Sequence, residues 1–264
     1  MVTLTRRAVL VGAAAAGTLT AGITPRRTLG LSGRSLILTA RPDPVTIDTA
    51  RTAVLVVDMQ NDFGAPGGML DRAGVDISAI RRSIAPIANS LDVARSHGIP
   101  VVYLKMGFKP DLSDLGSADS TNRIRHLRFG VGENVSAPDG KDSRMLIRDT
   151  WNTDILPELE PHEGDIVMYK TRFSGFYQTD LHEELTSLGI RDLIVTGCTT
   201  SVCVESTIRD AMFRDYRCVL LEDCTSEPIG SDFARSNHAA SLLTIEMLLG
   251  WVSESAHFVE ALEA

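Results

Sequence analysis

The chain has 264 residues, of which 44% are hydrophobic and 23% are charged, and its formal net charge at pH 7 is -8. This composition is typical of a globular protein with one large core, and the shortage of basic residues argues against a nucleic-acid partner. Four cysteines lie between residues 198 and 224 without the spacing of a zinc site, and a chain of this size does not need a disulfide framework.

Residues 1–38 are predicted to be a targeting segment and linker, separate from the fold. Arg6 and Arg7 precede a weakly apolar stretch, residues 8–23, that is rich in Ala and Gly. The pattern resembles a twin-arginine export signal, and the stretch is too short for a comfortable membrane span. We therefore expect no stable membrane span and export to the periplasm or the extracellular space. The alternative is a cytoplasmic protein with a disordered tail or a misassigned start codon.

From residue 42 onward, short apolar runs alternate with segments of helical period. This alternation predicts parallel strands joined by crossover helices. The runs lack polar alternation, as strands covered on both faces do, and they span residues 52–57, 100–104, 165–169, 192–196 and 217–221. The helical segments span residues 77–97, 179–188, 204–214 and 232–249. Residues 39–264 are thus predicted to form an α/β domain, a three-layer α-β-α sandwich around a mainly parallel, Rossmann-like sheet.

Ligands of such sheets bind at the carboxyl ends of the strands, where the order of connection reverses. Three residues with compatible chemistry follow predicted strands: Asp58, Lys170 and, after a tight turn, Cys203. A thiol at a helix N-terminus, beside an acid and a base, can be activated as a nucleophile. Residues 109–141 are poor in apolar period and predict a long surface excursion near this site, as a lid or a partner contact.

Each of these three residues also has a simpler interpretation when it is taken singly. Asp58 is equally suited to capping the next turn, Lys170 fits a surface lysine past a strand end, and an isolated cysteine is more often buried and inert. Their convergence on one edge of the predicted sheet favours the catalytic interpretation.

Four segments, in this order, carry a family resemblance: VVDMQNDF, YKTRFSGF, VTGCTTSVCVEST and LLEDC. Together they resemble the isochorismatase-like cysteine hydrolases, and the resemblance runs from about Thr39 to the C-terminus. It implies that Asp58, Lys170 and Cys203 form a catalytic triad, and that a cis peptide bond joins Cys198 to Thr199. In the expected mechanism, the backbone N–H groups of Thr199 and Cys203 form the oxyanion hole.

The resemblance also bears on the type of reaction and on the need for a metal. Family members that cleave isochorismate lack the cysteine, so its presence argues for acyl transfer. Nicotinamidase relatives hold a metal with an Asp and paired His set, whereas VVYLKMGFKPDLSD in this chain contains no histidine. We therefore expect no metal and no cofactor. By the same resemblance, the protein is expected to be a homo-oligomer.

Within the family, the segments GGMLDRAGVD, TSVCVESTIRD and GWVSESAHF most resemble ureidoacrylate amidohydrolases. The segment FKPDLSDL resembles biuret hydrolases. We expect a cysteine-dependent amidohydrolase that cleaves a C–N bond of a small ureido or amide substrate through a thioester or thiocarbamate. The alternative substrates are biuret and N-carbamoyl amino acids. A redox protein that pairs Cys198 with Cys203 and a non-catalytic binding protein are the rival classes.

Five further residues are predicted to contact the substrate. Arg172 is the candidate for binding a substrate carboxylate through two hydrogen bonds, with a solvated surface arginine as the alternative. Gln60 belongs to the first motif of the family. Phe63, Phe108 and Phe176 are predicted to form apolar walls, although each of them also suits the core.

Overall fold

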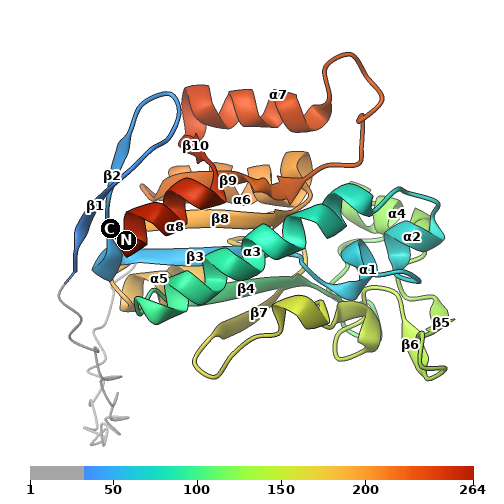
Figure 1. Cartoon of the computed structure of the whole chain (residues 1–264). Helices are drawn as coiled ribbons and strands as arrows, with labels where there is room; N and C mark the ends of the chain where they lie inside the picture. The colour runs from blue at the N-terminus through green and yellow to red at the C-terminus, as the bar shows by residue number, and fades with distance from the viewer. Residues whose placement is uncertain (1–32) are drawn as a thin grey trace, which may run out of the picture. The chain divides into compact units, whose positions relative to one another are not determined.

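A computed structural model of the chain describes residues 33–264, which form a six-stranded parallel sheet with helices on both faces (Figure 1). The sheet order is β10-β9-β8-β3-β4-β7. The strands are β1 (Ser35–Leu38), β2 (Val45–Asp48), β3 (Thr52–Val57), β4 (Val101–Met106), β5 (Asn134–Ser136), β6 (Asp142–Arg144), β7 (Ile166–Lys170), β8 (Asp192–Cys198), β9 (Arg217–Ser226) and β10 (Trp251–Ser253). The helices are α1 (Asn61–Gly64), α2 (Met69–Arg72), α3 (Ser78–Ser96), α4 (Thr121–Arg128), α5 (Leu181–Ser187), α6 (Glu205–Met212), α7 (Asn237–Thr244) and α8 (Ser255–Glu263).

The order of the strands reverses between β3 and β8. From β3 the chain moves to β4 on one side, and from β8 it moves to β9 on the other side. Because connections between neighbouring parallel strands are right-handed, α3 and α6 lie on opposite faces of the sheet. α8 packs beside α3 (Figure 1). The fold therefore places a ligand site beyond the carboxyl ends of β3 and β8.

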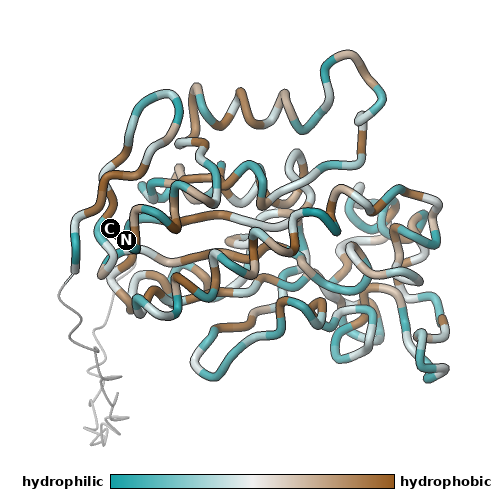
Figure 2. The backbone as a smooth tube through the Cα atoms, viewed as in Figure 1, coloured by the Kyte–Doolittle hydropathy of each residue, from teal (hydrophilic) through white to brown (hydrophobic). Residues whose placement is uncertain are grey.

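The core lies in the middle of the sheet, where every residue of β3 and β8 is buried. Figure 2 shows hydrophobic colour along the central strands and alternating colour along α3, as expected for a helix with one face on the core. The predicted three-layer fold is confirmed, and the five predicted strands occur within a few residues of their expected positions.

Several details differ from the predictions. β7 is an edge strand with Val167 46% exposed, so it is not covered on both faces. β9 continues to Ser226 rather than Leu221, because an irregularity in its pairing with β8 accommodates the polar residues that follow Leu221. The predicted helix 232–249 begins only at Asn237, where Ser236 caps it, and it ends in a π-helical turn, Ile245–Leu249.

The N-terminal hairpin and the surface excursion also go beyond the sequence prediction. β1 pairs with β2 from Ser35 onward, ahead of the predicted domain start at residue 39. The proposed twin-arginine segment lies outside the described residues. The excursion 109–141 contains α4, which was not predicted. Within residues 33–264, no helix is both long and apolar enough to cross a membrane.

Candidate active site

The site begins where β3 and β8 end side by side, with Val57 paired to Gly197. Gly197 has φ +110°, and a Cβ on it would lie 2.0 Å from the Val57 carbonyl oxygen, so only glycine fits this close approach. Asp58, the residue directly after β3, adopts φ 54°, a left-handed conformation that a residue with a side chain rarely takes. Such backbone strain costs about 1–3 kcal/mol and clusters at functional sites.

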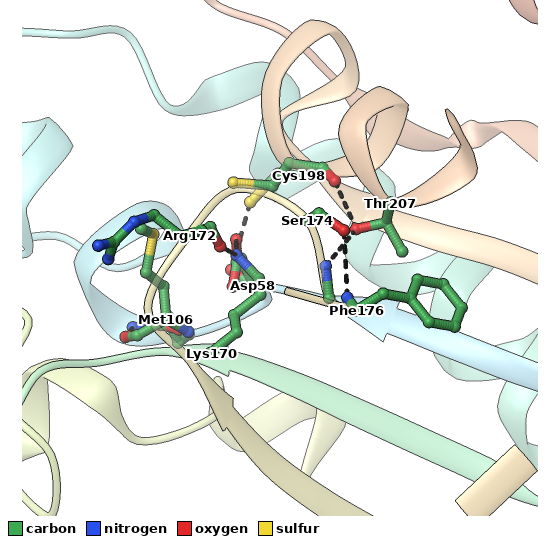
Figure 3. Close-up of polar contacts among 11 residues, drawn as sticks. Asp58, Met106, Lys170, Arg172, Ser174, Phe176, Cys198 and Thr207 are labelled. Carbon is green, nitrogen blue, oxygen red and sulfur yellow. Dashed lines mark hydrogen bonds and ion pairs between the residues drawn. The ribbon is translucent and has the colours of Figure 1, made fainter. Parts of the chain in front are cut away.

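Lys170 is the last residue of β7 and is completely buried. Its Nζ donates to Asp58 Oδ2 at 2.7 Å and to the Arg172 carbonyl at 3.3 Å (Figure 3). The other carboxylate oxygen, Asp58 Oδ1, is buried and has no conventional hydrogen-bond partner among the described residues. A buried ion pair with one free carboxylate oxygen leaves that oxygen available to receive a proton.

Cys203 lies in the π-helical turn Thr200–Val204, here named the cysteine turn, which runs directly into α6. The N–H groups of Val202 and Val204 both donate to the Thr199 carbonyl at 3.2 Å. Thr207 Oγ1 donates to the Cys203 carbonyl at 2.7 Å. The bond between Cys198 and Thr199, immediately before the cysteine turn, is cis. The turn therefore holds Cys203, which is 6% exposed, at the first turn of a helix.

The thiol, the carboxylate and the ammonium shift one another's pKa values. Burial and the Asp58 charge raise the pKa of Cys203, while Lys170 opposes that rise. Burial raises the pKa of Asp58, and Lys170 only partly offsets the rise. Burial opposes the charge of Lys170, but Asp58 and Cys203 together raise its pKa. These directions favour a protonated Cys203 thiol and a charged Lys170 ammonium in the resting site.

The structure thus brings Asp58, Lys170 and Cys203 together, as the sequence predicts, with the Cys198–Thr199 peptide beside them. The structure gives Gln60 a contact within the protein, and its predicted substrate contact stays a prediction. Its side chain is completely buried, its Nε2 donates to the Met106 carbonyl at 2.9 Å, and its Oε1 accepts from the Met106 N–H at 2.7 Å. Both ends of this amide therefore bind the backbone of β4 at Met106.

Phe176 also lies away from the predicted site. It points away from Asp58 and Lys170 in Figure 3, and its ring stacks on Tyr216 at 5.7 Å and lies under Arg214 at 5.1 Å. It is therefore a core residue. Phe63 is buried in α1, and its contact with substrate stays a prediction.

Phe108 and Arg172 follow the carboxyl ends of β4 and β7, at the edge of the sheet that holds Lys170. Phe108 is completely buried just beyond β4, with its ring against His126. Arg172 is half-buried, donates to the carbonyls of Thr171 and Asp114 at 2.6 and 3.3 Å, and lies over the Tyr177 ring at 5.5 Å. No carboxylate pairs with Arg172 within the part of the chain that the structure describes. Its guanidinium therefore retains capacity for an anionic ligand.

Sequence reasoning missed the residues that fix the cysteine turn from β9. The buried carboxylate of Glu227 accepts from the Ser201 N–H at 3.0 Å and from the Ser201 hydroxyl at 2.5 Å. Thr200 Oγ1 lies 2.9 Å from Thr225 Oγ1 and 3.0 Å from His238 Nδ1. The signal was present, since Glu227 follows β9, but the strand was predicted to end at residue 221, five residues before its observed end at Ser226.

All four cysteines of the chain are buried free thiols, Cys198 and Cys203 included. No cluster of three or more potential metal ligands occurs in residues 33–264.

Comparison with known proteins places this arrangement in a family. Residues 52–257 match the isochorismatase domain. The chain belongs to the isochorismatase family. It is 40% identical over 228 residues to the ureidoacrylate amidohydrolase RutB of Caulobacter segnis, covering 86% of this chain and 92% of that protein.

Two solved structures extend the likeness to three dimensions. A cysteine hydrolase from Pseudomonas syringae pv. phaseolicola 1448A matches with a TM-score of 0.70 and 29% identity, covering 88% of this chain and 98% of that one. N-carbamoylsarcosine amidase from Thermoplasma acidophilum shares the fold, with a TM-score of 0.57 and 24% identity over 78% of this chain and 96% of that one. The predicted isochorismatase-like fold and the assignment to this hydrolase family are confirmed.

Proposed function

We propose that this member of the isochorismatase family is a cysteine-dependent amidohydrolase, which cleaves a C–N bond of a small ureido or amide compound. The observation that carries the proposal is the buried Asp58–Lys170 ion pair, 2.7 Å long, beside the Cys203 thiol at the point where the sheet order reverses. These three residues are the proposed catalytic residues. The 40% identity to a protein named ureidoacrylate amidohydrolase supports the same reaction class.

In the first half of the reaction, Asp58 Oδ1 takes the proton of the Cys203 thiol, and the thiolate attacks the substrate carbonyl carbon. The raised pKa of Asp58 suits a group that must accept a proton, and the Lys170 ammonium stabilises the thiolate. The N–H groups of Thr199 and Cys203 are the proposed donors to the oxyanion. One such donor contributes about 3–4 kcal/mol to transition-state stabilisation.

In the second half, the C–N bond breaks as protonated Asp58 gives its proton to the leaving nitrogen. The acyl group stays on Cys203 as a thioester, or as a thiocarbamate if the substrate is a ureide. Water then attacks the same carbonyl, one of its protons goes to Asp58, and this proton returns to the departing sulfur. The products are the acid and the amine, and Asp58, Lys170 and Cys203 return to their starting states. No step requires a metal or a cofactor.

For the substrate, we propose a compound like ureidoacrylate, with biuret and N-carbamoyl amino acids as the alternatives. The half-buried Arg172, which has no carboxylate partner in the described residues, favours a substrate that carries a carboxylate. Met106 and Phe108, which are apolar, occupy the strand end where a fully polar substrate would need hydrogen bonds. These features favour a substrate with one anionic end and one less polar part.

The test is ammonia or amine release from a panel of ureidoacrylate, biuret, N-carbamoyl amino acids and simple amides. Cys203→Ser is the matched control, because it changes one atom of the proposed nucleophile. We expect activity on at least one C–N substrate and its loss in Cys203→Ser. Equal activity of the two proteins would refute the cysteine mechanism, and Arg172→Ala should raise KM for acidic substrates while leaving neutral biuret unaffected.

Homo-oligomerisation is a further part of this proposal. Large apolar side chains are exposed directly after α6, on α7 and on the π-helical turn after α7: Phe213, Leu243, Met247 and Leu248. A second copy that covers them would remove this apolar surface from water. Light scattering coupled to gel filtration should give a mass above that of one chain, which Leu248→Glu should reduce.

We also propose export through the twin-arginine route, on the strength of Arg6 and Arg7 before the apolar stretch. Cell fractionation tests this: full-length protein confined to the cytoplasm would contradict it.

A further inference from the structure

Helix α4 buries a histidine against the protein instead of its aliphatic side chains. Its one buried residue is His126, whereas Ile124 and Leu127 are 40% and 43% exposed. A helix that packed only for stability would bury its aliphatic side chains and leave the imidazole in water. The orientation of α4 therefore requires a reason other than hydrophobic burial, and it puts the imidazole inside.

The surroundings of His126 fix where its ring lies. The ring packs edge-on against Phe108 at 5.2 Å and lies 5.8 Å from the ring of Phe173. Phe108 follows the carboxyl end of β4, and Phe173 follows Lys170 at the carboxyl end of β7. The imidazole is thus held over the same edge of the sheet as the proposed nucleophile.

Hydrogen bonding fixes which ring nitrogen is free. His126 Nδ1 lies 2.7 Å from the Asn122 carbonyl oxygen, which can only accept, so Nδ1 carries the proton. In the neutral ring, Nε2 then presents a lone pair, and no hydrogen-bond partner for it occurs among residues 33–264. Burial lowers the pKa of His126, and the positive charges of Lys170 and Arg172 lower it further, so the ring stays neutral.

A neutral acceptor among aromatic rings, beside two cations, is suited to an uncharged N–H donor. We propose that His126 Nε2 accepts a hydrogen bond from an N–H group of the ureido or amide substrate and thereby selects substrates that carry this donor. The inference rests on the proposed amidohydrolase function and deepens it, because it assigns the group that binds the nitrogen side of the substrate. His126 is a substrate-binding residue in this scheme, separate from the proton transfers of Asp58 and Cys203.

Two substitutions separate the hydrogen bond from packing. His126→Leu keeps an apolar side chain of similar bulk and removes the acceptor, whereas His126→Gln retains an acceptor oxygen. Leu127→Gln, on the exposed side of the same helix, is the matched control. Each variant is assayed on the best C–N substrate of the panel and on p-nitrophenyl acetate, an activated ester without any N–H group.

We expect His126→Leu to lower kcat/KM for the C–N substrate by about tenfold or more, mainly through KM, because an unmatched donor is left in a buried site. Hydrolysis of p-nitrophenyl acetate should change less than about threefold, and His126→Gln should recover most of the loss. Equal losses on both substrates, or no loss on the C–N substrate, would overturn the assignment. Failure of the proposed function has a different signature, namely C–N hydrolysis that survives Cys203→Ser.

Discussion

The buried ion pair between Asp58 and Lys170 provides the sharpest test of the site's electrostatics. Lys170→Met removes the ammonium but keeps a long apolar side chain, so it leaves the Asp58 carboxylate buried without a counter-charge. Breaking a buried pair in this way destabilises a protein by about 3–5 kcal/mol. In a chain of this size that corresponds to a fall in Tm of roughly 6–20 °C.

The chain contains its own control for this experiment. Lys141 and Asp139 form an ion pair of nearly the same length, 2.8 Å, but their side chains are 82% and 51% exposed. Water screens such a pair, so it contributes little to stability. Lys141→Met should therefore change the unfolding free energy far less than Lys170→Met does.

Urea unfolding followed by circular dichroism measures Lys170→Met, Lys141→Met, Asp58→Asn and the double variant Asp58→Asn/Lys170→Met. Because the double variant leaves no unpaired charge, we expect it to recover part of the stability lost in each single variant. All three variants at Asp58 and Lys170 should lack C–N hydrolase activity. If Lys170→Met is as stable as Lys141→Met, the buried ion pair is refuted. Removing one member of such a pair leaves an uncompensated charge in the core, which must lower the stability.

Further predictions concern the residues around the pair. Gly197→Ala should cost about 2 kcal/mol or more of unfolding free energy in urea titration, because its φ of +110° and the Val57 carbonyl exclude a Cβ; an unchanged midpoint would contradict this. Glu227→Gln should lower kcat about tenfold with little change in KM, since one acceptor to Ser201 is lost; a change in KM alone would speak against a role in the cysteine turn. Burial raises the pKa of Asp62 to about 6, so the folded protein holds a proton that the unfolded chain releases near pH 4. This contribution to stability is present below about pH 4 and is lost as the pH rises through about 6, and unfolding of Asp62→Asn should lack that slope. Iodoacetamide should alkylate Cys203 slowly at neutral pH and faster in Asp58→Asn, which loses the charge that raises the thiol pKa; mass spectrometry of the labelled peptide would detect the opposite order.

The fold was predictable where the sequence contains long signals. The central strands are almost uninterrupted apolar runs. Lys170 ends such a run, Asp58 follows one directly and Cys203 follows one after a tight turn, so the convergence of the three proposed catalytic residues could be inferred without coordinates. The three-residue strand β10 and the hairpin of β1 and β2 are too short to produce a periodic signal. The polar pair Glu222 and Asp223 interrupts β9 and hid its last residues, together with Glu227.

Side-chain direction was the part of the site that the sequence could not supply. Phe176 and Phe108 are equally apolar, yet one packs against Tyr216 and the other against His126, and only the path of the backbone decides between them. His126 was hidden for a related reason. It lies in a helix with three arginines, Arg123, Arg125 and Arg128, whose composition indicates a solvated surface element.

The Gln60 side chain compensates for the strand pairing that is lost where the backbone turns away from the sheet at Asp58. The pairing of β3 with β4 ends at Val57 and Leu104, and the Asp58 N–H still reaches the Leu104 carbonyl at 2.8 Å before the chain turns away at φ 54°. Met106 of β4 would then lose its neighbour on that side, with a buried N–H and a buried carbonyl to satisfy. The Gln60 amide binds both groups and replaces the missing strand. Because Met106 pairs on its other side with Lys170, the same amide keeps β4 and β7 in register and so holds the lysine within reach of the carboxylate. The residue that sequence reasoning assigned to substrate binding is, on this argument, what allows a strand end to become a catalytic site.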